Sequence, residues 1–375
     1  MFVSMLLLLL MTPGAAFGLA SPEAPPVPQS ENSNQLLSPA EITELKTQAT
    51  NGDAIAQTAL GRAYRQGAGV RKDDQAALGW IRKAADQGYG PAENELGLMY
   101  RIGQGVTPDK QEAVRWYLKA AKHGNPRAMF NLGASYYNGD GVEADHVKSL
   151  AWFLLAREAG DPMAQEAVQR ASSERNAQSV AAFAAIGKMF ETGNELPKEP
   201  IEALKWYRKA ADAGDDEAQV KAASLLLAQD HNPTKEEYTE VFQRCEKAAK
   251  SPSAIGAYCM AVLYKRGIGT SPNTEEYAKW LGRAANHGHA RATLEFGEAY
   301  WKGEGIKSDL VKAYMWIWIA YSSKVAGAEQ DEQALRKEMD PKQVERAKED
   351  ATLWLMHPPV LGLRQRQATD SPPPN

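Results

Sequence analysis

The sequence predicts an all-α fold, a right-handed solenoid of stacked helical hairpins. The first observation is a repeat: residues 54–89 and 90–125 align without a gap at a period of 36 residues, and 126–161 continues in register. The second is the pattern inside each unit, where apolar residues such as Ala56 and Leu60 recur at helical spacing before a Gly-rich break and a second helical segment. One hairpin buries too little apolar surface to fold alone, so stacked hairpins must share a continuous core.

The repeat also returns in the second half of the sequence. The same frame is found at 180–215, at 254–289 and from 290 onward, whereas 216–253 fits only with a two-residue insertion. Three columns recur: a Leu-Gly-x-x-Tyr core, a Gly-x-Gly loop and an Ala-x-x-Trp helix. The core glycine allows close approach of the partner helix, and the loop glycines supply the positive φ of a tight turn. The tryptophan column holds six of the nine tryptophans: Trp80, Trp116, Trp152, Trp206, Trp280 and Trp316.

Taken together, these columns resemble the Sel-1-like repeat, a relative of the tetratricopeptide repeat with a longer loop between its helices. The unit at 90–125 carries the pattern most completely, at Gly105-Val106, Asp109, Ala113, Trp116-Tyr117, Lys119-Ala120-Ala121 and Gly124-Asn125. The resemblance covers most of residues 40–327 and departs from the pattern in 162–179 and 216–253. It implies an α/α superhelix and roles such as adaptor, envelope regulator, polysaccharide-export assembly factor or host-interaction factor.

Two departures from the repeat indicate how the array is divided. The segments around Ala167 and Ala334 each follow a repeat unit and lead into a further helix. We interpret each as a closing helix pair that covers an open end of the array. We therefore expect two repeat blocks, 38–178 with three full units and 179–356 with four. The blocks either stack continuously or bend near residue 175.

The N-terminal segment predicts export. The apolar run from Phe2 to Met11 is too short to cross about 30 Å of hydrocarbon, and the small residues up to Ala20 are typical of a signal-peptide cleavage site. We expect a signal peptide at 1–20, a Pro-rich disordered spacer at 21–37 and a disordered tail at 357–375. The expected location is the bacterial periplasm or the exterior, with no stable membrane insertion after cleavage. In a eukaryote the same signal would indicate the endoplasmic reticulum lumen.

Composition and motifs indicate a non-catalytic protein. A net charge of −4 gives no basic field for nucleic acid. The sequence has no Ser-x-x-Lys, Gly-x-Ser-x-Gly or His-Glu-x-x-His motif, and its Gly-x-Gly loops recur at one repeat position rather than opening a phosphate-binding loop. The only close histidine pair, His287 and His289, falls in an inter-unit turn, where polar residues cap helices. We predict no catalytic residue, no cofactor and no metal site.

Cys245 and Cys259 are the only cysteines, and each lies seven residues from Pro252. Because Pro252 marks a turn between antiparallel helices, the two cysteines are expected side by side. An oxidising compartment favours a disulfide between them. The alternative is a pair of buried, reduced thiols.

Partner binding is expected on the concave face, lined by the first helix of each unit. The stripe next to the core stripe, beginning with Thr58, Arg62 and Arg65, should be free to line this groove. Large aromatic residues and arginine are favoured binding anchors. The alternative is that some of these side chains pack against the adjacent unit. The groove candidates are Arg62, Arg65, Arg101, Phe130, Tyr137, Tyr258, Lys265 and Trp301.

The sequence therefore favours an exported, non-catalytic scaffold or adaptor that binds a protein partner in its groove, in envelope regulation or host interaction. One alternative is a glycan- or cell-wall-binding solenoid that uses Tyr137, Tyr258 and Trp301 as stacking platforms for sugars. A less favoured alternative is a hydrolase that acts on cell-wall material without a known motif.

Overall fold

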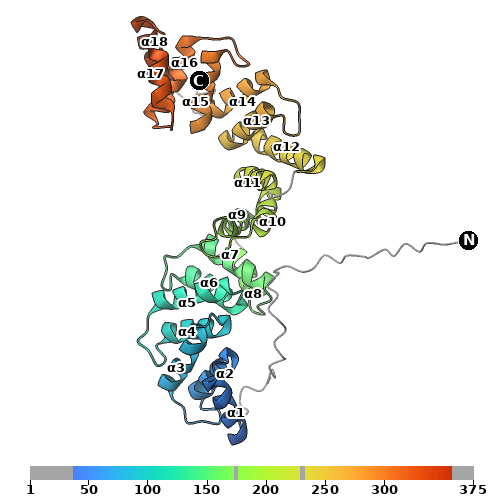
Figure 1. The fold of residues 1–375 in the computed structure, drawn as a ribbon, viewed down its shortest axis with the longest axis vertical. Coiled ribbons are helices and arrows are strands. Elements are labelled where there is room, and N and C mark those ends of the chain that lie inside the picture. Colours follow the sequence, from blue (N-terminus) through green and yellow to red (C-terminus); the bar gives the residue numbers. More distant parts are fainter. Residues whose placement is uncertain (1–36, 173–175, 229–232, 357–375) are drawn as a thin grey trace, which may run out of the picture.

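The computed structural model describes residues 37–172, 176–228 and 233–356. Over these residues the protein folds into 18 α-helices without a β-strand, and Figure 1 shows them stacked into an elongated array. The predicted all-α class is confirmed. The predicted signal peptide at 1–20, the tail at 357–375 and all but the last residue of the spacer at 21–37 lie outside the described residues.

The helices pair into antiparallel hairpins, each made of a first and a second helix that pack together. An additional helix, α1 (Pro39–Thr50), packs on the first hairpin through Ile42 and Ala49. The hairpins are α2 (Ala54–Gln66) with α3 (Asp74–Ala85), α4 (Gly90–Ile102) with α5 (Lys110–Lys122), α6 (Pro126–Asn138) with α7 (His146–Glu158), α9 (Asn176–Thr192) with α10 (Pro200–Asp212), α11 (Asp216–Leu227) with α12 (Lys235–Lys250), α13 (Ala254–Arg266) with α14 (Thr274–Asn286), and α15 (Ala290–Lys302) with α16 (Leu310–Ser322).

Repeated end signals fix the length of each helix. In the first unit the Asp53 side chain accepts hydrogen bonds from the backbone N–H groups of Ile55 and Ala56, so it caps the start of α2. Gly67 ends α2 with φ of 77°, in the left-handed region that favours glycine. Asp109 caps α5 in the same manner. The loop columns of the sequence therefore act as start and stop signals.

The core glycines set the distance between the two helices of a hairpin. A Cβ atom on Gly97 would lie 2.6 Å from the Tyr117 ring, and one on Gly187 would lie 2.8 Å from the Tyr207 ring. Both distances are well inside van der Waals contact. The aromatic side chain of the second helix therefore packs directly against the backbone of the first.

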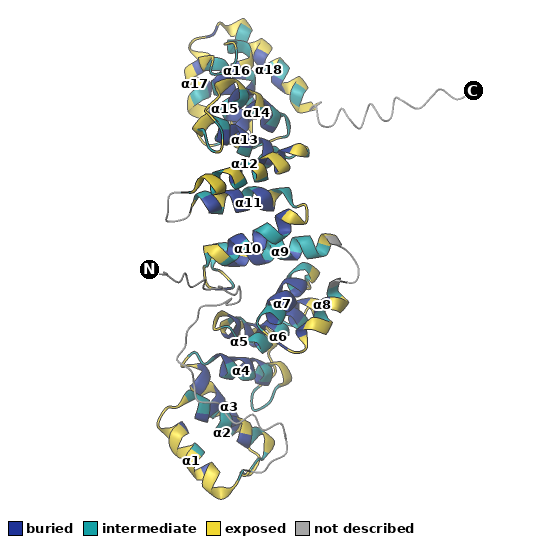
Figure 2. Cartoon of the chain, turned by 90° about the vertical axis from the view of Figure 1, so that its right-hand side faces the viewer, coloured by how far each residue is buried: buried dark blue, intermediate teal, exposed yellow. Residues whose placement is uncertain are grey.

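The hydrophobic core continues across the predicted border between the two blocks. One cluster of buried residues includes Trp152 of α7 and Trp206 of α10, on either side of residue 178, and Figure 2 shows buried residues in every layer of the stack. The border itself falls inside α9. This helix follows the short helix α8 (Ala164–Ser172), packs on α7, and also serves as the first helix of the fourth unit.

The C-terminal end of the array repeats this arrangement without a further unit. Helices α17 (Ala328–Arg336) and α18 (Pro341–Met356) both pack on α16, as α8 and α9 pack on α7. Helix α18 buries Val344, Ala347 and Ala351, whereas Arg346 and Glu349 are exposed. The exposed side of α18 is polar in its first turns, and its last turn exposes Leu353, Leu355 and Met356.

No helix in the described part of the protein is long and apolar enough to span a membrane.

Candidate interaction surface

Side-chain hydrogen bonds link the first helices of neighbouring units at α2–α4, α4–α6, α9–α11 and α13–α15. The surface that the first helices present is here called the first-helix face. The stripe that begins at Thr58 is predicted to line the groove, with the alternative that some of its side chains pack against the adjacent unit. At the first position of the stripe the alternative holds in three units, because Thr58, Asn94 and Leu294 are buried. Asn94 is covered by the following unit, whose Asn131 donates a hydrogen bond to its side-chain oxygen over 2.8 Å.

Arg62 and Arg65 pair with the following unit. Both extend from α2 to Glu95 on α4, with N–O distances of 3.0 and 2.6 Å. Glu95 and Arg65 are largely shielded from solvent, with 13% and 18% of their side chains exposed. These two candidates therefore tie neighbouring units together.

The same link recurs with reversed charge in the second block. Glu191 of α9 accepts hydrogen bonds from Lys221 of α11 at 3.1 Å and from the Tyr207 hydroxyl at 2.7 Å. Burial alone would raise the pKa of the Glu191 carboxyl, but these hydrogen bonds outweigh it and hold the pKa below its usual range. Glu191 is therefore a charged partner of the Tyr207 hydroxyl at neutral pH.

Tyr258 and Lys265 belong to a second tyrosine–carboxylate group. The Tyr258 ring stacks on His289 with centroids 4.1 Å apart, and its hydroxyl donates to Glu295 over 3.1 Å. Lys265 donates to the Tyr277 hydroxyl over 2.9 Å. Burial and the nearby Glu295 charge raise the pKa of Tyr258 to about 12. Both candidates are held by internal contacts.

The side chains of Phe130 and Trp301 are also held by contacts within the protein. The Phe130 ring packs against Phe153 with centroids 5.4 Å apart and adjoins the hydrophobic core. The Trp301 indole N–H donates to Glu338 over 3.0 Å. Three aromatic residues are candidate stacking platforms for sugars. Of these, Trp301 and Tyr258 are half-buried and Tyr137 is exposed.

Arg101 and Tyr137 are the candidates that remain available. Arg101 is exposed and forms no ion pair with a described residue, and Tyr137 is 53% exposed with its ring edge-on to His146. They occupy the same repeat position in the last turns of α4 and α6, helices joined by the bond between Asn94 and Asn131. We call Arg101, Asn131 and Tyr137 the α4–α6 patch.

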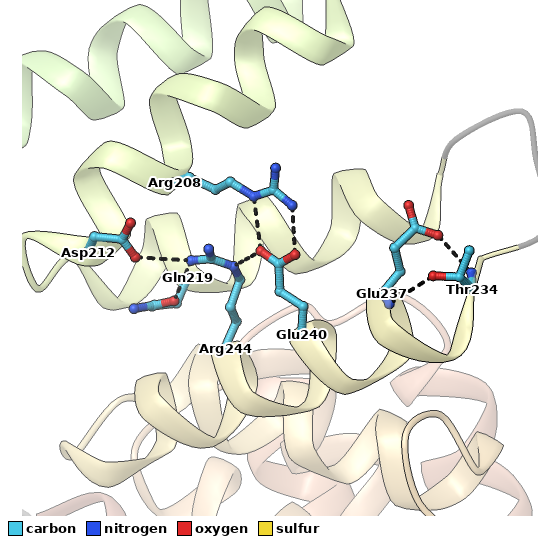
Figure 3. Close-up of polar contacts among 7 residues, drawn as sticks. All are labelled: Arg208, Asp212, Gln219, Thr234, Glu237, Glu240 and Arg244. Atoms are coloured by element: carbon cyan, nitrogen blue, oxygen red, sulfur yellow. Dashed lines mark hydrogen bonds and ion pairs between the residues drawn. The ribbon is translucent and has the colours of Figure 1, made fainter. Parts of the chain in front are cut away.

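The degenerate unit at 216–253 is braced by a polar network that sequence reasoning missed. Glu240 lies between two arginines (Figure 3): Arg208 donates to both of its oxygens over 2.9 and 2.7 Å, and Arg244 donates over 2.7 Å. Arg244 also donates to Gln219 of α11. Burial alone would raise the pKa of Glu240, but the two arginines hold it below its usual range. The network joins three helices and replaces the absent Leu-Gly column.

One sequence signal for this segment was available. Thr234 and Glu237 form a reciprocal capping box at the start of α12, with the two hydrogen bonds drawn in Figure 3. The spacing Thr-x-x-Glu before a helical run is a known N-terminal signature. It would have fixed the start of α12 although the loop glycines are missing.

The structure joins Cys245 of α12 to Cys259 of α13 by a disulfide, with Cα atoms 5.6 Å apart. This separation lies in the range that a disulfide requires. The bond and the arginine network stabilise the same unit from two sides. Oxidation of the pair in the cell remains a prediction.

No cluster of three or more potential ligands for a metal ion occurs among the described residues. His289 caps α15, its ring nitrogen accepting a hydrogen bond from the Ala292 N–H over 3.1 Å. This is the capping role expected from its turn position.

Stacked hairpins with a shared core, each offering its first helix to one surface, define a helical-repeat protein. Six segments match the Sel1 repeat, residues 54–89, 90–125, 126–161, 181–215, 254–289 and 290–317. The protein therefore belongs to the Sel1 repeat family, whose members typically serve as non-catalytic scaffolds for protein interaction. The unmatched segment 216–253 is the unit braced by the arginine network.

Two solved structures are similar to this protein. A protective antigen of uropathogenic Escherichia coli strains that displays an SLR fold is 23% identical, with a TM-score of 0.46; the match covers 89% of the present sequence and 83% of the antigen. A Sel1 repeat protein from Oxalobacter formigenes is 26% identical, with a TM-score of 0.43; the match covers 87% of the present sequence and 90% of that protein.

Proposed function

We propose that this protein is an exported, non-catalytic adaptor that binds a protein partner through the first-helix face, centred on the α4–α6 patch. One observation supports this choice of site. Four of the eight groove candidates are exposed: Arg62, Arg101, Tyr137 and Lys265. Arg62 is paired with Glu95 and Lys265 donates to the Tyr277 hydroxyl, whereas Arg101 and Tyr137 form no ion pair with a described residue. Arginine and tyrosine are also among the residue types that most often dominate binding energy at protein interfaces.

The rest of the first-helix face suits a rigid support for this patch. Arg65 with Glu95, and Glu191 with Lys221, cross-link neighbouring first helices. A side chain held in one position loses little conformational entropy when a partner binds. The partner would therefore meet a preorganised surface with two free anchors.

Site-specific photo-crosslinking in the native compartment tests this proposal. A photoreactive amino acid is placed at Tyr137, and in a matched control at Lys122, which is exposed on the second helix α5. We expect a discrete protein adduct from position 137 that is absent from position 122. No adduct from 137, or the same adducts from both positions, would contradict the proposal.

Export is a separate part of the proposal. It is supported by the apolar run and small residues of the first 20 positions. Cell fractionation of the full-length protein, followed by N-terminal sequencing, should find a mature protein that begins at Ser21 outside the cytoplasm. An intact Met1 terminus in the cytoplasmic fraction would contradict export and leave the interaction surface to be tested separately.

A further inference from the structure

Buried tyrosine hydroxyls in the second helices are paired with carboxylates of adjacent helices. The Tyr207 hydroxyl donates to Glu191 over 2.7 Å, and Tyr277 donates to Glu295 over 3.3 Å. Tyr314 donates to Glu332 of α17. Each pair gives a buried hydroxyl the acceptor that it needs.

Tyr117 is the exception. Its side chain is completely buried, yet no described residue accepts a hydrogen bond from its hydroxyl, and the group beside the hydroxyl is the Arg101 guanidinium, which can only donate. Its ring lies across Gly97 as the Tyr207 ring lies across Gly187. The hydroxyl is therefore directed toward the position that Glu191 occupies in the fourth unit.

In the second unit, the repeat position of Glu191 is taken by a cationic residue, Arg101. Residues 101, 117 and 131 are each separated by 90 positions from Glu191, Tyr207 and Lys221, so Arg101 replaces the acid of the fourth unit and Asn131 replaces its lysine. Burial raises the pKa of Tyr117 to about 12, Arg101 partly opposes this rise because its guanidinium is close to the hydroxyl, and the negative charge of Glu95 adds to the rise without accepting a hydrogen bond from Tyr117.

None of the described carboxylates completes this group. Glu95, on the same helix as Arg101, is already bound by Arg62 and Arg65. Asn131 uses one of its two amide hydrogens for Asn94, which leaves the other available. Arg101 lies beside the Tyr117 hydroxyl, and Asn131 stands at the repeat position of Lys221, which meets Glu191 in the fourth unit. The three side chains are donors of different kinds, and no carboxylate of the described residues accepts a hydrogen bond from Tyr117.

We propose that Arg101, Tyr117 and Asn131 form a binding site for a carboxylate of the partner, either an Asp or Glu side chain or the carboxylate at a polypeptide C-terminus. This inference rests on the proposed adaptor function and names the chemistry of the contact. The partner's carboxylate takes the place that Glu191 fills internally in the fourth unit, and it accepts charge-assisted hydrogen bonds from Arg101 and a hydrogen bond from Tyr117. The Tyr117 oxygen is shielded, so binding requires a rotamer change of an exposed neighbour such as Arg101, which occurs within nanoseconds.

The site can be tested without knowing the partner. The full-length protein is labelled with 3-fluorotyrosine, and the Tyr117 resonance is identified among the 14 tyrosines by its loss in Tyr117→Phe. The probe is acetate, with acetamide and with sodium chloride at equal ionic strength as controls. We expect a saturable shift of the Tyr117 resonance with acetate alone. N-acetylglycine and N-acetylaspartyl amide then distinguish a C-terminal carboxylate from an acidic side chain by which of them binds more tightly.

Variants decide whether the response belongs to this site. Arg101→Gln should weaken acetate binding about tenfold or more, because a hydrogen bond to a charged group is lost. Arg101→Glu supplies Tyr117 with an internal carboxylate and should abolish the response. Lys188→Gln, a change of an exposed lysine on α9, should leave it unchanged. Absence of a saturable shift, or a shift that survives Arg101→Gln, would overturn the site.

Failure of this site is distinguishable from failure of the adaptor function. A partner crosslinked at Tyr137 with equal yield in wild type and Arg101→Gln would overturn the carboxylate site and leave the adaptor proposal standing. A saturable acetate response without any protein adduct in the cell would support the site and contradict the adaptor proposal.

Discussion

Tyr117 and Tyr207 occupy the same position of two repeat units, but of the two only the Tyr207 hydroxyl has an acceptor among the described residues, the Glu191 carboxylate 2.7 Å away. The backbone around the two rings is equivalent, since each crosses a core glycine. The difference arises from one residue, because Arg101 stands where Glu191 stands. Units with the same fold therefore present side chains of opposite charge at this position of the first-helix face.

The two tyrosines predict opposite effects of the same substitution. Tyr207→Phe removes a hydrogen bond to a charged group and should lower the free energy of unfolding by about 1–3 kcal/mol. Tyr117→Phe removes a buried donor without a partner and should leave stability unchanged or raise it by up to about 1 kcal/mol. Urea unfolding of both variants provides the measurement. Equal losses of stability would show that Tyr117 has an acceptor after all.

The core glycines predict a strong effect of a single methyl group. Gly97→Ala places a Cβ 2.6 Å from the Tyr117 ring and should destabilise the protein by about 1–3 kcal/mol. Gly79 lies inside α3 with nothing within 4 Å of its added Cβ, so Gly79→Ala is the matched control and should stabilise by up to about 1 kcal/mol. The two melting temperatures should move in opposite directions. A melting temperature of Gly97→Ala equal to that of wild type would refute the close approach of α4 and α5.

The inter-unit ion pairs should contribute more than ordinary surface pairs. Glu95→Gln removes the partner of Arg62 and Arg65 at a site largely shielded from solvent, and we expect a loss of about 1–2 kcal/mol. Arg115→Ala breaks an exposed pair with Glu112 within α5, and its effect should stay below about 1 kcal/mol. The comparison is made by urea unfolding at low salt. A smaller loss for Glu95→Gln than for Arg115→Ala would contradict the linking role of Glu95.

The Cys245–Cys259 disulfide predicts a measurable dependence on reductant. Closing a loop of about 15 residues is associated with about 3 kcal/mol of stabilisation in chain-entropy models. Dithiothreitol should therefore lower the melting temperature of the wild-type protein but not of the double variant Cys245→Ser, Cys259→Ser. Mass spectrometry after thiol alkylation of protein taken from its native compartment should show no modified cysteine. Full alkylation of both residues would favour the alternative of two buried thiols.

Much of the fold was predictable because each repeat column performs a necessary physical task. Glycine is required where Gly97 meets the Tyr117 ring, and again where Gly67 ends α2 with positive φ. Such requirements recur in every well-formed unit, so they are visible in the sequence. The unit at 216–253 lacks them, and its network of Arg208, Glu240 and Arg244 depends on contacts among three helices that have no sequence period.

The interaction surface was predictable only in part. The helical period identifies which positions share a stripe, but it does not show that the following unit covers Asn94 or that Leu294 packs near the start of α17. Nor does it show which charges are paired within the protein. Arg65 and Arg101 occupy the same repeat position, yet only Arg65 meets a carboxylate among the described residues, since Glu95 is followed 36 positions later by Asn131.

The most direct test of the central claim is the affinity of the partner captured at Tyr137, measured by isothermal titration calorimetry. Wild type is compared with Arg101→Gln on the first-helix face and with Lys122→Gln on the second helix α5. If the α4–α6 patch is the binding site, Arg101→Gln should raise the Kd about tenfold or more, because it removes a central anchor. Lys122→Gln should change the Kd by no more than about twofold, as expected for an exposed charge outside the interface. Equal Kd values for all three proteins would contradict binding at the first-helix face.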